Sequence, residues 1–520
     1  MTYKQERMAD SIAKKKTKTN VIFGTALGVF SFLLNVVSGI LVTRAIISYF
    51  GKSQYGIYTL AESIVSLFLL DLGIGTIIMK YYCQYEAKNE TQKAADFLGL
   101  VMKIFIIADL VILVAFFVFY FLIDSIYIGL TSGEKDSLRI CFTIAAMFAV
   151  VSFPSKPFDG VLAAKEDFIF QKLVEIIQKL LSVVAYILVI CLKLNLYWLV
   201  ALIGLSSLFS VILKIWYVLR KDHIRINYRF KPDRAFLKEI LTFSLWVVIS
   251  SLCWTIYTYL SPSILGIVCT TEEIAVFSIA ASIYSYLVAF ASITNNYFFP
   301  TISRLVNSEK TGEKSGIMKL SIFVGKIQYS AVLLLLVGFA SCGYEFIMVW
   351  MKYDASFSIA YVGMLLLSFA LLISMPGTVF KSEMYARGFA KHLAFAQIVS
   401  VVFFVVLTFL LGYFFGLLGA FIGIGLAKLL RVLLELFFYH KDLGTNIGSL
   451  YKKVCLRETV AVLPSLAIGL LLHFLLSFSF LVKFFIIGFS VLLSFVLLSF
   501  LFGFSKQEKT VIKNVIVRKR

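Results

Sequence analysis

The sequence predicts an all-α polytopic membrane protein with about 14 spanning helices, and three observations carry this prediction. Hydrophobic residues make up 60% of the 520 residues and charged residues only 15%. A chain of this composition has too little polar surface to cover itself in water, so lipid must be its solvent. Apolar runs of spanning length recur along the whole chain, and Lys and Arg gather in alternate connections between them.

Each apolar run is long enough to cross about 30 Å of hydrocarbon as a helix. The predicted spans lie near residues 21–45, 56–80, 98–122, 138–161, 168–191, 196–219, 238–262, 274–300, 318–342, 357–380, 391–414, 416–439, 456–478 and 481–504. The closely spaced pairs among them are compatible with helical hairpins, because two antiparallel helices need only a few residues of turn.

The distribution of basic residues predicts the orientation. Counted with the adjoining helix ends, 36 of the 49 Lys and Arg residues lie in the two tails and the even-numbered connections, and 7 lie in the odd-numbered connections. Because Lys and Arg gather on the cytoplasmic side, we expect a multi-pass protein of a bacterial cytoplasmic membrane with both termini in the cytoplasm. Topology thus explains the net charge of +20 better than nucleic-acid binding does.

Two internal matches predict a duplicated unit. Tyr55–Ile64 (YGIYTLAESI) is echoed by Ile274–Ile283 (IAVFSIAASI), and Pro154 with Phe158 is echoed by Pro376 with Phe380 at a nearly equal shift along the chain. With six helices per unit, both copies insert the same way up. We therefore expect two six-helix lobes related by a pseudo-two-fold axis along the membrane normal, with two further helices after them.

These observations predict the domain organisation. It consists of a basic cytoplasmic tail (1–20), an N-lobe (21–219), a basic inter-lobe linker (220–237), a C-lobe (238–440), a connection with helices 13 and 14 (441–504) and a second basic tail (505–520).

Motifs for chemistry are missing from the sequence. The seven cysteines contain no CxxC pair and the four histidines show no metal-ligand spacing. There is no Walker motif, Gly-rich nucleotide loop or nucleophile elbow. We expect no metal, no cofactor, no catalytic residue and no enzymatic activity. A membrane glycosyltransferase or polymerase is the alternative from another class.

Ionisable residues at membrane depth are the candidate functional groups, because each costs roughly 2.5–3.5 kcal/mol there and usually faces protein or a watery cavity. Glu62 and Asp71 lie in the second predicted span. They are candidates for ion coupling, and the alternative is a hydrogen-bonded structural carboxyl. Nine residues apart, they fall on nearly opposite sides of a helix and do not predict one paired site.

Polar and basic residues in other spans are candidates for lining a cavity. Ser285 and Asn296 belong to a stripe of small and polar residues at helical spacing, which is also compatible with close helix packing. Glu175 and Lys179 share a polar face and can pair. Lys428, Arg431 and Glu435 lie near the cytoplasmic end of their span, where snorkelling is the favoured interpretation. Basic groups around a cavity suit an anionic cargo, and the cavity candidates are Arg44, Lys80, Lys103, Glu175, Lys179, Ser285 and Asn296.

Three stretches carry a family resemblance. They are Asn20–Ile47 (NVIFGTALGVFSFLLNVVSGILVTRAII), Tyr49–Ile64 (YFGKSQYGIYTLAESI) and Leu70–Tyr82 (LDLGIGTIIMKYY). With the plan of six, six and two helices, they make the chain similar to the polysaccharide-flippase branch of the multidrug/oligosaccharidyl-lipid/polysaccharide exporter superfamily.

The resemblance implies two six-helix lobes across a V-shaped cavity, working by alternating access. It implies a cargo of undecaprenyl-pyrophosphate-linked oligosaccharide, carried from the inner to the outer leaflet for O-antigen, capsule or exopolysaccharide synthesis. Cationic cavity residues would receive the pyrophosphate, for which Arg44, Lys80, Lys103 and Lys179 are the positions of interest. Expected partners are the lipid-linked substrate, membrane lipid and, through function, glycosyltransferases and a polymerase; no nucleic acid is expected, and the protein is expected to be a monomer. A cation-coupled multidrug exporter and a peptidoglycan lipid-precursor flippase are the alternatives within the superfamily.

Overall fold

The computed structural model describes residues 27–69, 74–88, 90–165, 167–220, 226–230, 234–293, 302, 306 and 315–503. Contacts divide the chain into two compact units, Met1–Ile274 and Ala275–Arg520. All regular elements in the described ranges are helical, as the composition predicts.

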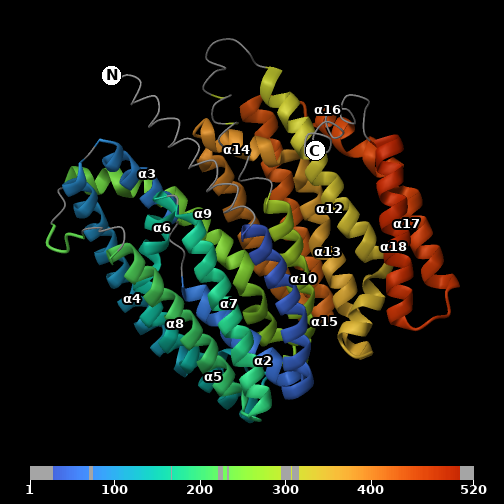
Figure 1. Ribbon diagram of the computed structural model, residues 1–520, viewed down its shortest axis with the longest axis horizontal. Coiled ribbons are helices and arrows are strands. Elements are labelled where there is room, and N and C mark those ends of the chain that lie inside the picture. Colours follow the sequence, from blue (N-terminus) through green and yellow to red (C-terminus); the bar gives the residue numbers. More distant parts are fainter. Residues whose placement is uncertain are drawn as a thin grey trace, which may run out of the picture. The chain divides into compact units, whose positions relative to one another are not determined.

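Unit 1 begins with a helix at Leu27–Phe50. Its further elements are α2 (Lys52–Phe68), α3 (Ile74–Ala87), α4 (Thr91–Ile126), α5 (Ser132–Ser152), the 3₁₀ turn η1 (Phe153–Ser155), α6 (Lys156–Ala164), α7 (Phe168–Cys191), α8 (Leu196–Arg220) and α9 (Arg234–Val268). In Figure 1, α7 and α8 lie beside each other, as their many contacts also show. Large apolar side chains such as Phe97, Phe105 and Phe142 form the buried interior.

The described elements of unit 2 follow a similar order. Its elements are α10 (Thr271–Ile293, which starts at the unit boundary), α12 (Ser315–Trp350), η3 (Ala355–Phe357), α13 (Ser358–Ser374), the 3₁₀ turn η4 (Met375–Gly377), α14 (Thr378–Ala386) and α15 (Ala390–Leu443). The last elements are α16 (Ile447–Tyr451), the π-helical turn η5 (Lys452–Leu456), α17 (Arg457–Leu475), α18 (Phe480–Leu498) and the π-helical turn η6 (Ser499–Gly503).

Helix boundaries confirm the duplication. The first residues of α2 and α10 are separated by the same shift as the matched sequences Tyr55–Ile64 and Ile274–Ile283. Both copies also break one spanning helix at a 3₁₀ turn that contains Pro154 or Pro376. The short helices α6 and α14 follow these turns at once and have equal lengths. Proline removes a backbone donor and so interrupts the helix at the same place in both units.

The fourteen predicted spans agree with the described helices, with differences in how they are divided. The spans expected at 138–161 and 357–380 are each divided by a 3₁₀ turn followed by a short helix. Twelve helices among the described residues are long and apolar enough to cross a membrane. The span expected at 56–80 is divided into α2 and α3, on either side of residues that the structure does not describe. The spans expected at 391–414 and 416–439 run together as α15, which turns back at Gly416 with a φ of 60°.

Glycines allow α15 to fold on itself as a hairpin. A Cβ at Gly419 would lie 2.0 Å from the carbonyl oxygen of Leu411, and a Cβ at Gly423 would lie 2.7 Å from that of Leu407. From Gly419 to Gly423 the chain advances four residues, and the facing residue moves back four, from Leu411 to Leu407. This is the pattern of two antiparallel helices. The absence of side chains lets the two backbones approach, as small residues do in membrane helices.

Packing and duplication divide the chain at different places. The repeat assigns the helix at 238–262 to the second lobe, whereas α9 packs within unit 1 on α2. Ser63 of α2 donates a hydrogen bond to the Tyr259 carbonyl and lies 3.0 Å from the Ser263 hydroxyl. Pro262, which has no backbone N–H to donate, lies in α9 close to these contacts.

Candidate functional site

A polar cluster in unit 1 joins α2 to α7 and α9. Tyr58 and Glu62 of α2 lie close enough to Tyr186 of α7 for the three side chains to interact electrostatically, and Tyr259 of α9 is within the same range of Glu62. Lys179 of α7 lies close enough for its positive charge to act on Glu62. The structure therefore brings together two predicted residues that the sequence had assigned to different roles.

Glu62 and Lys179 are both accessible. The Glu62 side chain is exposed and that of Lys179 is half-buried, although protein atoms surround Glu62 densely. A carboxylate and an ammonium at this depth reduce each other's cost of leaving water. Helical spacing explains the cluster, because Tyr58 and Glu62 are four residues apart on α2 and share one face.

The remaining predicted residues of unit 1 lie in other environments. Glu175 pairs with Lys172 at 2.6 Å rather than with Lys179. The Lys103 ammonium donates to the Phe230 carbonyl at 2.9 Å, which ties α4 to the inter-lobe linker. Arg44 is half-buried in its helix, and the ion pairs found among the described residues do not include it.

Of the four other predicted residues, the structure describes the side chain of Ser285 alone. Ser285 is exposed on α10 and donates to the Ser282 carbonyl of its own helix at 2.7 Å, which is the local bonding that serines adopt in membrane helices. Asp71 and Asn296 lie outside the described residues, and Lys80 lies in α3 but its side chain is not described.

Unit 2 contains a buried cation, Lys428, for which the sequence predicts an exposed position at the cytoplasmic surface. Lys428 is only 8% exposed, and its ammonium lies 3.6 Å from the centre of the Tyr284 ring. The interpretation that Lys428 snorkels to the cytoplasm is therefore wrong, because its ammonium turns toward α10. Nothing in the local sequence distinguished the two directions, since the rotation of the helix decides which way the side chain points.

Lys428 has aromatic rather than acidic neighbours. The side chains acting on it are the neutral Tyr284 and the like-charged Arg431, and no carboxylate among the described residues forms an ion pair with it. Cation–π contact offsets part of the cost of burying an ammonium, but a buried charge normally requires an opposite charge. This part of unit 2 is therefore suited to receive an anion.

Ion pairs of opposite polarity occupy matching positions in the two units. In unit 1, Asp159 of α6 lies 2.7 Å from Lys214 of α8. In unit 2, Lys381 of α14 lies 3.3 Å from Glu435 of α15. Asp159 and Lys381 are both the fourth residue of their short helices. The two units thus share an ion pair at this position, but the acidic residue is on the short helix in unit 1 and the basic residue is on it in unit 2.

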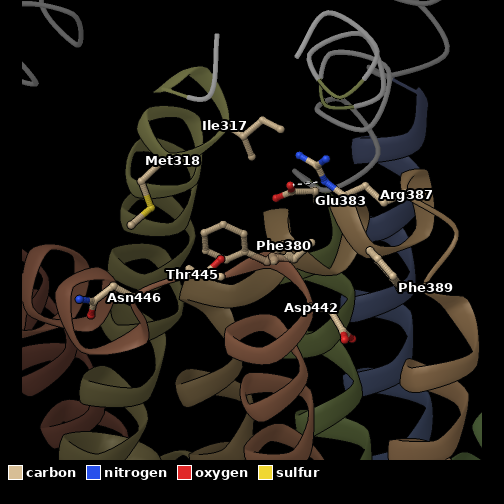
Figure 2. A pocket seen from close by; sticks show the side chains of 11 residues that line it. Ile317, Met318, Phe380, Glu383, Arg387, Phe389, Asp442, Thr445 and Asn446 are labelled. Carbon is tan, nitrogen blue, oxygen red and sulfur yellow. Dashed lines mark hydrogen bonds and ion pairs between the residues drawn. The ribbon is translucent and has the colours of Figure 1, made fainter. Parts of the chain in front are cut away.

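A cavity of about 430 Å³ lies where α12 begins and where α14 and α15 end. Figure 2 shows Ile317 and Met318 of α12 near Phe380 and the Glu383–Arg387 pair of α14. Glu383 and Arg387 are 2.6 Å apart, and Asp442 is 2.6 Å from the His392 imidazole. Both carboxylates in this wall thus have cationic or imidazole partners, and the cavity lacks the uncompensated charge found at Lys428.

Comparison with known proteins identifies the family. The family model described as "Polysaccharide biosynthesis protein" matches residues 17–306, more than half of the chain. No curated protein matches.

Solved structures show the same fold at low identity. The lipid II flippase MurJ in an inward closed conformation is 16% identical with a TM-score of 0.66, covering 91% of this chain and 98% of its own. An inward-facing MATE family transporter of the MOP superfamily is 14% identical with a TM-score of 0.63, covering 82% and 99%. The Vibrio cholerae MATE transporter VcmN is 14% identical with a TM-score of 0.59, covering 84% and 99%. This chain thus belongs to the polysaccharide biosynthesis protein family and has the fold of MOP superfamily transporters.

Proposed function

We propose that this protein carries polyprenyl-pyrophosphate-linked oligosaccharide repeat units from the inner to the outer leaflet, for O-antigen, capsule or exopolysaccharide synthesis. The observation that carries the proposal is Lys428, a buried cation within the predicted span 416–439 with no acidic partner among the described residues. Such a charge is costly until an anion arrives, and a pyrophosphate supplies one. Membership of a polysaccharide biosynthesis family supports a glycan cargo.

Alternating access gives the transport a physical basis. Moving a sugar head group through hydrocarbon costs several kcal/mol of free energy for each polar group that has no hydrogen-bond partner. A hydrated path spares the head group while the polyprenyl chain stays in lipid. The protein acts as a monomer in a cytoplasmic membrane, with both termini in the cytoplasm. Glycosyltransferases supply the cargo on the inside, and a polymerase consumes it outside.

A peptidoglycan lipid-precursor flippase is the second candidate. The lipid II flippase MurJ shares the fold, and a polyprenyl pyrophosphate precursor would satisfy Lys428 equally well. A multidrug exporter for cations is disfavoured, because a cationic cargo would meet an uncompensated positive charge in unit 2.

Deletion and complementation test the proposal. Cells that lack the protein should lose the surface glycan, and the wild-type chain should restore it. We expect Lys179→Ala and Arg44→Ala to lower surface glycan severalfold without lowering protein abundance, because each removes a cation available to the cargo. Lys93→Ala is the matched control, since Lys93 is 62% exposed and pairs with Glu90 at the surface.

Three outcomes would overturn the proposal. Lysis on depletion with normal surface glycan would identify a peptidoglycan-precursor flippase. Resistance to cationic toxins with normal glycan would identify a drug exporter. Sugar transfer by the purified protein would identify an enzyme.

A further inference from the structure

The last two helices form a hairpin that encloses an apolar groove with one basic end. The groove has a volume of about 640 Å³ and lies at the end of α17 and α18 away from their connecting turn. Its apolar walls include Val460, Pro464, Leu498 and Phe502, and its basic residues are Lys452 and Arg457. Its volume is that of a ligand site rather than of an ion or water site.

Two π-helical turns and a buried carboxylate build this end of the hairpin. The turns are η5 at the start of α17 and η6 at the end of α18. Glu458 is fully buried and accepts a hydrogen bond from the Ser499 hydroxyl of η6. A Cβ at Gly503 would lie 2.1 Å from the Glu458 carboxylate, so glycine makes room for it. The two helix ends are therefore held together around the groove.

The cations at the mouth are positioned by the same elements. Arg457 Nε donates a hydrogen bond of 2.7 Å to the Phe502 carbonyl, which holds the guanidinium across the mouth of the groove. The Lys452 side chain is exposed and lines the same groove one turn earlier. Val460 and Phe502 are each 59% exposed, so the apolar wall opens to the surroundings of the helices, which are lipid.

We propose that this groove binds an anionic glycerophospholipid of the bilayer, with its phosphate at Lys452 and Arg457 and an acyl chain along Val460, Pro464 and Leu498. Charge complementarity selects the head group, because basic sites at the ends of spanning helices attract anionic lipid. Mass action selects a phospholipid over the transported carrier lipid, since the bilayer component is in large excess and occupancy follows concentration. The proposal does not depend on the transported cargo.

Lipid retention by the full-length, delipidated protein tests the assignment by native mass spectrometry. Dioleoyl phosphatidylglycerol and dioleoyl phosphatidylcholine share their acyl chains and differ in charge. We expect the wild-type protein to retain the anionic lipid on the order of tenfold better, given two basic contacts. Lys452→Gln and the double variant Lys452→Gln/Arg457→Gln should remove the preference. Lys453→Gln should keep it, because Lys453 is exposed in the same turn but does not line the groove.

A second variant tests the apolar part of the groove independently of charge. Val460 lines the groove and is 59% exposed, so Val460→Ser should lower retention of both lipids while the thermal unfolding temperature stays within a few degrees of wild type. Equal retention of the two lipids, or an anionic preference that survives the double variant, would overturn the proposal. Preferential binding of added polyprenyl phosphate over phosphatidylglycerol would overturn it as well, by assigning the groove to the carrier lipid.

Discussion

Lys428 and Lys179 illustrate two ways in which this protein keeps a cation at membrane depth. Lys179 lies near an acidic partner, Glu62, and the two charges support each other in a polar cluster with Tyr58. Lys428 contacts the ring of Tyr284 instead, and no carboxylate among the described residues pairs with it. A carboxylate balances the charge of Lys179, whereas none among the described residues balances that of Lys428, so Lys428 is the stronger of the two candidates for holding an anionic group.

Lys428→Met should separate stability from transport. Replacing a buried charge with an apolar side chain of similar length is often neutral or stabilising, by about 1–4 kcal/mol, so we expect an equal or higher thermal unfolding temperature in detergent. Export of surface glycan should nevertheless fall several-fold, because the anion loses its partner. A variant that exports normally would remove Lys428 from the substrate site.

At the scale of elements, both units combine a proline-containing 3₁₀ turn with an ion pair from the short helix that follows it, but the residues of the ion pair differ. A proline-containing 3₁₀ turn separates α5 from α6 and α13 from α14. An ion pair then fastens each short helix to a long one that follows, through Asp159–Lys214 and Lys381–Glu435. The 3₁₀ turn interrupts the regular backbone hydrogen bonds of the helix. The partly buried ion pair then holds the short helix that follows, α6 or α14, in place.

Exchanging charges tests whether these pairs fix the short helices. Lys381→Glu should place two carboxylates together and destabilise unit 2, because breaking a buried pair is costly, by about 3–5 kcal/mol before allowance for the partial exposure of Lys381. Adding Glu435→Lys should recover much of the loss, since it recreates the polarity found in unit 1. Thermal unfolding of the single and double variants measures the coupling; additive losses would show that the pair does not interact.

The hairpin of α15 depends on glycine where its two helical halves come closest together. Gly419→Ala places a methyl group against the Leu411 carbonyl, and overpacking of this kind costs about 1–3 kcal/mol. We expect a lower thermal unfolding temperature. Gly338→Ala is the matched control, because Gly338 lies within α12 with open space around its Cα, where alanine is neutral or favourable. Equal unfolding temperatures for the two variants would contradict the close approach.

For the whole molecule, the distribution of Lys and Arg predicts which connections face the cytoplasm. In a cysteine-free background, Gly129→Cys should react with a membrane-impermeant maleimide added outside intact cells, and Lys441→Cys should react only after the membrane is opened. Both positions are exposed, so that access is set by sidedness alone. The reverse labelling pattern would invert the predicted topology.

The sequence by itself determined the membrane class, the positions of the spans and the duplication. Helix length, apolar content and a repeated proline can be recognised from the order of the residues alone. The 3₁₀ turns and the short helices α6 and α14, which divide two of the predicted spans, were not predicted from the sequence. It also named Glu62 and Lys179 as candidates, because a charge in an apolar run stands out wherever the helix points.

Only the tertiary structure decided which of these charges meet. Glu62 with Lys179, Asp159 with Lys214, and Lys428 with Tyr284 lie on helices distant in sequence, and their meeting depends on how each helix is rotated about its axis. Rotation follows from the packing of whole helix faces, such as the glycine contact within α15, which no local pattern of residues specifies. Burial then gave Lys428 its significance, since the cost of a charge depends on what surrounds it.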